Sequence, residues 1–124
     1  MVATGPITPA RGEIWWVNLD PIVGHEQAGR RPALVISDTT FNAGPQGLVI
    51  VLPMTRAHRR YRLHVWAEPA DTGLRDPGAI MCDQIRTVSH TRFLDRTPAG
   101  MASPAVVAQV EARLRAILPL PRNL

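Results

Sequence analysis

Apolar and polar residues alternate in short runs along most of the chain, and only its last part repeats with the period of a helix. Runs rich in β-branched and aromatic residues predict strands over 13–19, 32–37, 48–52 and 62–68. The run over 79–88 predicts one or two further strands, and we expect a bend or bulge near Asp83 because the apolar phase slips there. Loops are predicted where glycine and proline occur between these runs, over 21–31, 38–46 and 69–78.

A helix is predicted to begin at Ser103 as the N-cap, with Pro104 at the first helical position, and to end at Pro119. Its apolar residues fall on one stripe: Val106, Val107, Val110, Leu114, Ile117 and Leu118. Five or six short strands followed by one amphipathic helix predict a mainly β fold, a small curled sheet or barrel. The helix would pack on an outer face or cover an open end.

The composition indicates a single soluble globular domain. The chain has 124 residues, of which 45% are hydrophobic and 19% charged. We expect a flexible leader over 1–10, the domain over 11–118 and a tail over 119–124. The longest apolar run is far too short to span a bilayer and the leader lacks a secretory signal, so a cytoplasmic protein without a membrane partner is expected. The first and third strands are apolar on both sides, which hints at an oligomer.

The charge narrows the choice of partner. All fourteen basic residues are arginines, and against ten acidic residues they give a formal net charge of +4. Each of these cations is a planar fork suited to phosphates and to stacking on bases. The excess favours an anionic partner without identifying one.

The densest candidate for function is the segment 24–32, GHEQAGRRP. It places two arginines, a carboxylate, an imidazole and an amide between and beside two glycines, directly before a strand. Flexible glycines allow close approach of the backbone, and Arg31 lies at the mouth of a strand that Pro32 stiffens. The alternative is a solvated loop in which Glu26 pairs with an arginine.

Two further segments carry polar groups that suit nucleic acid. Thr55 precedes the run 56–62, in which four arginines and a tyrosine resemble a phosphate track with one stacking surface, or else form an exposed hairpin. On a straight strand Gln84 and Arg86 would project from one face and read base edges or grip a phosphate, although a polar sheet surface fits equally well.

Other residues carry weaker signals. Trp15, Trp16 and Trp66 are expected in the core or at an interface, and the single cysteine, Cys82, as a small buried apolar residue. The default for His58, His64 and His90 is a surface role. The histidines lack the spacing of a metal site and one cysteine cannot form a cysteine-based cage, so no metal is expected.

Several of these segments, in this order, resemble the MazF/PemK toxins. The matching segments are the opening strand at 11–21 (RGEIWWVNLDP), the loop at 24–32 with the strand after it at 33–37, the strand at 49–55 and the DQIRT segment at 83–87. The resemblance covers about residues 11–118. It implies an SH3-like barrel of the CcdB/PemK type with a C-terminal helix.

For function, the resemblance implies the toxin of a toxin–antitoxin pair, a sequence-specific endoribonuclease that cuts single-stranded RNA without a metal or other cofactor. The ribose 2′-hydroxyl attacks the adjacent phosphate and leaves 2′,3′-cyclic phosphate and 5′-hydroxyl ends. The family works as a homodimer. RNA lies in a groove that the antitoxin's disordered tail also covers.

Carried over by position, the family's catalytic arginine and threonine fall on Arg31 and Thr55, and Glu26 matches a glutamate near the site. The candidate RNA-binding residues are His25, Gln27, Arg30, Arg59, Gln84 and Arg86. His25 departs from the family, where serine is common, and Arg59 matches only loosely. A planar cation and a hydroxyl suit the negative charge that builds on phosphorus. The general base stays open between Glu26, His25 and Arg31 in an altered environment.

Two other functions are compatible with the same fold. A CcdB-like toxin would bind gyrase through its C-terminal helix, but the prolines within 118–124 make a continued helix unfavourable. A non-catalytic RNA-binding barrel would bind RNA with a steep salt dependence and leave it intact.

Overall fold

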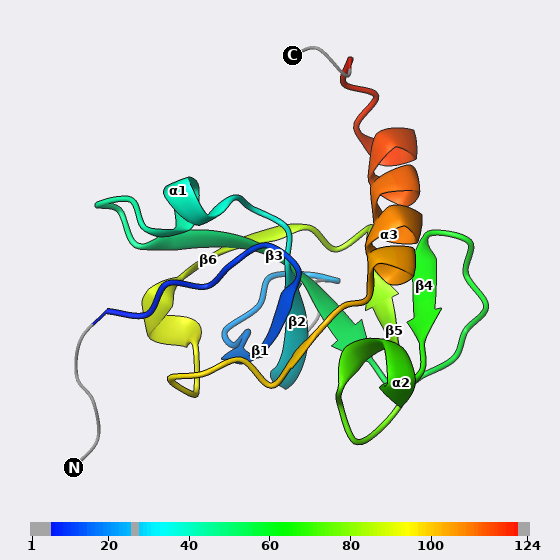
Figure 1. Ribbon diagram of the computed structural model, residues 1–124, viewed down its shortest axis with the longest axis horizontal. Helices are drawn as coiled ribbons and strands as arrows, with labels where there is room; N and C mark the ends of the chain where they lie inside the picture. Colours follow the sequence, from blue (N-terminus) through cyan, green and yellow to red (C-terminus); the bar gives the residue numbers. More distant parts are fainter. Residues whose placement is uncertain (1–5, 26–27, 122–124) are drawn as a thin grey trace.

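The computed structural model describes residues 6–25 and 28–121, and within them the chain forms a curled antiparallel sheet with a C-terminal helix (Figure 1). The strands are β1 (Glu13–Asn18), β2 (Arg30–Val35), β3 (Leu48–Thr55), β4 (His64–Ala67), β5 (Gly78–Met81), β6 (Arg86–Ser89) and β7 (Gly100–Met101). Their order is β4-β5-β3-β2-β1-β7, and β6 also pairs with β3. This arrangement confirms the predicted fold class.

The central strand β3 holds the two parts of the sheet together. Its first half pairs with β6 and its last residues pair with β5, while β2 lies along its other edge. It continues past the predicted end at 52 to Thr55, even though Pro53 has no N–H to donate. The added length brings Thr55 to the end of the strand, where the site is found.

Alternation along the strands gives the sheet two buried faces. On β1, Ile14 joins a core with β4, β5 and the helix, whereas Trp15 and Val17 face a second core. Ile7 and Phe93 cover that second core, and the ring of Phe93 meets Trp15 edge to face at 5.4 Å. Most of the apolar side chains of β1 and β3 are therefore buried within the single chain, whereas Trp16 of β1 stays 39% exposed.

The helix α3 (Pro104–Ile117) begins as predicted, with the Ser103 hydroxyl accepting a hydrogen bond from the Val106 amide at 3.3 Å. Val106 and Val110 are buried against the sheet, but Leu118 lies beyond the helix and is 47% exposed, so its place on the apolar stripe was wrong. None of the helices in the described part of the chain is long and apolar enough to cross a membrane.

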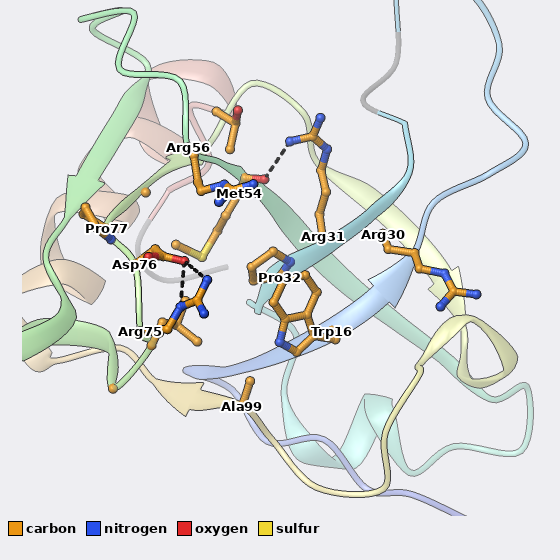
Figure 2. A pocket seen from close by; sticks show the side chains of 14 residues that line it. Trp16, Arg30, Arg31, Pro32, Met54, Arg56, Arg75, Asp76, Pro77 and Ala99 are labelled. Carbon is orange, nitrogen blue, oxygen red and sulfur yellow. Dashed lines mark hydrogen bonds and ion pairs between the residues drawn. The ribbon is translucent and has the colours of Figure 1, made fainter.

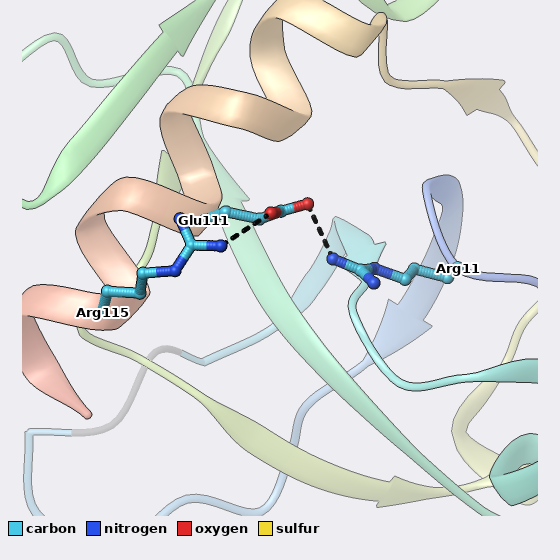
Figure 3. A network of polar contacts seen from close by, with 3 residues as sticks. All are labelled: Arg11, Glu111 and Arg115. Atoms are coloured by element: carbon cyan, nitrogen blue, oxygen red, sulfur yellow. Dashed lines mark hydrogen bonds and ion pairs between the residues drawn. The ribbon is translucent and has the colours of Figure 1, made fainter. Parts of the chain in front are cut away.

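A polar network ties α3 to the start of β1 (Figure 3). Glu111 accepts hydrogen bonds from Arg11 at 2.8 Å and from Arg115 at 3.4 Å.

The predicted loops also contain two single-turn helices, α1 (Thr39–Asn42) and α2 (Pro69–Thr72), and the 3-10 turn η1 (His90–Arg92) follows β6. Helices this short have no apolar period to detect, so the sequence pattern missed them.

Candidate active site

Strand pairing brings Arg31 and Thr55 together. In the antiparallel register of β2 and β3, Ala33 lies opposite Pro53, and continuing the same register sets Arg31 opposite Thr55. Directly opposed residues point to the same face of a sheet. The start of β2 and the end of the central strand β3 therefore lie side by side at one end of these strands.

The guanidinium of Arg31 is held by two backbone carbonyls, and Figure 2 shows the one from Met54. Its Nε donates to the Ala28 oxygen at 2.7 Å and its Nη1 to the Met54 oxygen at 3.4 Å. Burial, and then the positive charge of Arg59, lowers the pKa of Arg31. Arg31 is thus a half-buried, pre-oriented cation that has lost part of its hydration, which strengthens its attraction for an anion.

Thr55 is nearly buried, with 9% of its surface exposed. Its Oγ1 accepts a hydrogen bond from the Ala57 amide at 3.2 Å. Because this bond uses a lone pair, the hydroxyl proton can still be donated to a ligand oxygen. β-Branching restricts the rotamers of the side chain, so the donor is held in place.

Arg31 and Thr55 line a cavity of about 550 Å³, within the usual range for a ligand site of about 300–1,000 Å³. Its walls come from β1, β2, the end of β3 and the α2–β5 loop at 73–77 (Figure 2). The apolar lining consists of Trp16, Pro32, Met54, Leu74, Pro77 and Ala99, and the charged lining of Arg30, Arg31, Arg56, Arg75 and Asp76. Four arginines against one carboxylate suit an anionic ligand, and the apolar lining suits a flat one.

The other candidate residues of segment 24–32 differ in where they lie relative to the cavity. Glu26 and Gln27 lie outside the described residues. His25 is exposed and is not part of the cavity lining, whereas Arg30 lines the cavity. Arg59 lies outside the lining, but its charge acts on Arg31.

The DQIRT segment bends as the apolar phase predicted. The chain turns at Cys82 and Asp83, and the backbone N–H of Gln84 donates to the Met81 carbonyl oxygen at 3.1 Å. Gln84 therefore lies in the turn, while Arg86 begins β6 and donates to the Pro21 carbonyl at 3.4 Å. The two side chains do not share a straight strand, and neither lines the cavity.

The surface role expected for His64 was wrong. Its side chain is 9% exposed and its Nε2 lies 3.2 Å from the Asp83 carboxylate, so it links β4 to the turn before β6. His58 stacks on Trp66 with ring centroids 4.1 Å apart, which ties the arginine-rich loop 56–63 to β4. These contacts depend on strands that are distant in sequence, and no local pattern reveals them.

Among the residues that line the cavity, sequence reasoning missed three with an aromatic or charged side chain. Trp16 was expected in the core or at an interface, yet it is 39% exposed and faces the cavity. Arg75 and Asp76 lie in a segment that was predicted only as a loop. One signal was available, because adjacent residues of a strand face opposite sides and Trp15 and Trp16 cannot both enter the same core.

Within the described residues, no group of three or more histidine, cysteine, aspartate or glutamate side chains is placed to hold a metal ion. Cys82 is fully buried, as expected. Burial raises its pKa to about 11, which keeps it a neutral thiol. The polar side chains that line the cavity, among the described residues, carry guanidinium, hydroxyl and carboxylate groups.

The fold and the cavity define a small β-rich protein with a cavity lined mainly by apolar and cationic side chains. The family model of PemK-like, MazF-like toxins of type II toxin-antitoxin systems matches residues 10–118. The chain belongs to this family.

Individual relatives agree over most of the chain. Endoribonuclease PemK of Escherichia coli is 37% identical over 113 residues, 87% of this chain and 80% of the relative. Endoribonuclease MazF9 of Mycobacterium tuberculosis is 36% identical over 115 residues, 89% of this chain and 96% of the relative.

Solved structures show the same fold. The crystal structure of MazF (Form-I) from Deinococcus radiodurans superposes with a TM-score of 0.79 at 32% identity, over 91% of this chain and 98% of that one. A MazE-MazF complex (Form-III) from the same organism gives a TM-score of 0.70 at 28% identity, over 92% of this chain and 99% of that one.

Proposed function

We propose that the protein is a toxin that cleaves single-stranded RNA at a short sequence without a metal. The observation that carries this proposal is the meeting of Arg31 and Thr55 in one cationic cavity. Similarity to endoribonucleases PemK and MazF9 supports RNA as the substrate. The CcdB-like alternative loses support because α3 ends at Ile117, before the proline-containing tail.

In the proposed reaction the ribose 2′-oxygen attacks the neighbouring phosphorus as its proton passes to a base. The bond from phosphorus to the 5′-oxygen then breaks, and that oxygen takes up a proton, leaving a 2′,3′-cyclic phosphate and a 5′-hydroxyl. Negative charge builds on the non-bridging oxygens in the transition state. Donors fixed beforehand on Arg31 and Thr55 stabilise that charge without reorganisation.

We assign proton abstraction to Glu26, because arginine is a weak base and Glu26 precedes Arg31 by five positions in the sequence. The lowered pKa of Arg31 also makes it a better proton donor than an ordinary arginine. The residues that we propose to bind the RNA are His25, Gln27, Arg30, Arg59, Gln84 and Arg86.

The remaining parts of the proposal concern partners. We propose a homodimer in the cytoplasm, inhibited by an antitoxin whose disordered tail covers the RNA groove. Two observations support it: solved MazE-MazF complexes from Deinococcus radiodurans share this fold, and apolar Val23 and Met101 are exposed on the single chain. Light scattering after size-exclusion chromatography would return twice the monomer mass, and a single-chain mass would exclude the dimer.

Cleavage of a mixed single-stranded RNA pool in the presence of EDTA tests the activity. We expect cuts at few positions, with 2′,3′-cyclic phosphate ends. Arg31→Ala and Thr55→Ala should fold normally, by circular dichroism, and lose at least about 100-fold in kcat/KM. Arg115→Ala removes an exposed arginine of α3 and serves as the control. Intact RNA would contradict the proposed activity, and near-full activity of either site variant would contradict the assignment of residues.

A further inference from the structure

The exposed indole of Trp16 is the most distinctive feature of the cavity. Trp16 lies opposite Pro32 in the register of β1 and β2, so the two side chains lie next to each other and give the cavity an apolar surface. Figure 2 shows this surface directly below Arg31. Trp16 and Arg31 line one cavity. An aromatic ring and a cation suit the base and the phosphate of a nucleotide, and stacking on an aromatic ring accepts any base.

The opposite wall carries a carboxylate among arginines. Arg75 and Asp76 belong to the α2–β5 loop and face Trp16 and Pro32 across the cavity (Figure 2). Arg75 donates to Oδ2 of Asp76 from Nη2 at 3.1 Å and from Nε at 3.3 Å. Both bonds end on the same oxygen, so Oδ1 keeps lone pairs for a ligand.

A carboxylate in this place discriminates between ligands. It repels a phosphate, so the phosphate belongs at Arg31 and the space before Asp76 belongs to a neutral group that donates hydrogen bonds. Guanine, adenine and cytosine each carry an exocyclic amino group that donates two hydrogens. Uracil has one N–H between two carbonyl oxygens, and those oxygens repel a carboxylate.

We propose that this cavity is a base-reading pocket next to the scissile phosphate, in which Trp16 stacks on the base and Asp76 accepts a hydrogen bond from its exocyclic amino group. The pocket therefore excludes uracil at one position of the cleavage sequence. Arg75, whose side chain is 88% exposed, pairs with the Asp76 carboxylate at the rim of this pocket. This inference rests on the proposed function, since the base is read as part of an RNA strand bound at Arg31 and Thr55.

Sequencing the cut ends of an RNA pool tests the pocket in the active protein. At one position beside the cut we expect an amino-bearing base, and Asp76→Asn should reduce the discrimination against uracil there by about tenfold, because an amide both donates and accepts. Trp16→Leu should raise KM by about tenfold with little change in kcat, since stacking contributes to binding. Unchanged base preference in Asp76→Asn would overturn the proposal.

Binding of uncleavable strands separates this inference from the proposed activity. Single-stranded hexamers of deoxycytidine, deoxyadenosine or deoxyuridine lack the attacking 2′-hydroxyl and can be titrated against the whole protein by tryptophan fluorescence. Cytosine and adenine hexamers should bind about tenfold tighter than the uracil hexamer. They should quench the fluorescence of Trp16, so the quenching should be smaller in Trp16→Leu. Equal affinity for the three hexamers, or equal quenching in Trp16→Leu, would overturn the pocket even if RNA is cleaved.

Matched substitutions outside the cavity complete this test. Phe41→Leu removes an exposed aromatic ring on α1, and Asp95→Asn removes an exposed carboxylate from a loop outside the cavity lining. Both should keep the base preference and the affinities of the unmodified protein. A loss of preference in Asp95→Asn equal to that in Asp76→Asn would show an effect of overall charge and contradict the pocket.

Discussion

The reactivity proposed for Arg31 comes from its immediate surroundings. Two carbonyl oxygens, from Ala28 and Met54, hold different nitrogens of the guanidinium. This arrangement needs donors spread over a planar fork, which lysine does not have. Charge alone therefore does not explain the choice of residue.

Replacing Arg31 with lysine tests the importance of the fork. Arg31→Lys keeps a positive charge but cannot satisfy both carbonyls and still face a phosphate, so we expect kcat/KM for RNA cleavage to fall at least about 30-fold with normal folding. Arg115→Lys on α3 is the control and should cleave normally. Near-normal cleavage by Arg31→Lys would mean that a point charge is sufficient.

Cys82 gives a pH dependence of stability with a definite sign. Its folded-state pKa is raised from about 9 to about 11 by burial, so over this range the unfolded chain releases a proton that the folded chain keeps. The contribution is therefore fully present below pH 9 and is lost as the pH rises to 11. The expected loss is about 2 to 3 kcal/mol in the free energy of unfolding.

Urea unfolding at several pH values between 9 and 11 measures this loss. Cys82→Ala lacks the thiol, so its free energy of unfolding should depend less steeply on pH by the same amount. Parallel curves for the two proteins would show that other groups cause the pH dependence.

Among the connecting elements, the contact between α2 and β7 sets one wall of the cavity. A side chain at Gly100 would overlap the carbonyl oxygen of Thr72, the last residue of α2. The α2–β5 loop that carries Arg75 and Asp76 begins directly after Thr72. Close backbone packing at Gly100 therefore determines where this wall lies.

Gly100→Ala should force α2 and β7 apart and lower the free energy of unfolding by about 1 to 3 kcal/mol in urea. Gly24→Ala is a suitable comparison, because Gly24 has open space around it and a φ of +62°. Gly24→Ala should lower the free energy of unfolding by only about 1 kcal/mol, because the left-handed backbone conformation is unfavourable for alanine. Equal costs for the two variants would contradict a steric role for Gly100.

The molecule as a whole carries a net charge of +4, and arginines of several elements gather around one cavity. Binding of a single strand should therefore release counterions and weaken as salt is added. The charge of Arg59 contributes to lowering the pKa of Arg31, and we expect Arg59 to contact the bound nucleic acid as well.

A plot of log affinity for the deoxycytidine hexamer against log salt concentration measures this effect. Arg59→Ala should make the slope shallower by about 0.7, the value for one phosphate contact on a single strand. Arg115→Ala should leave the slope unchanged. An unchanged slope in Arg59→Ala would remove Arg59 from the binding surface.

The regular elements were predictable because their signals are local. The first strand was predicted from its own β-branched and aromatic residues. The helix was predicted from Ser103 and Pro104, which directly precede its apolar stripe. The same holds for the bend at Asp83. The single turns α1 and α2 escaped because four residues do not complete an apolar period.

From the sequence alone, the strands other than the two-residue β7, the helix α3 and the concentration of arginines near Thr55 and in segment 24–32 were determined, since propensity and charge belong to individual residues. Only the tertiary structure decided that Trp15 enters a core while Trp16 lines a cavity, and that Arg75 and Asp76 face it. Strand register and the path of the α2–β5 loop depend on packing between distant segments. No local pattern encodes which side chains will share a cavity.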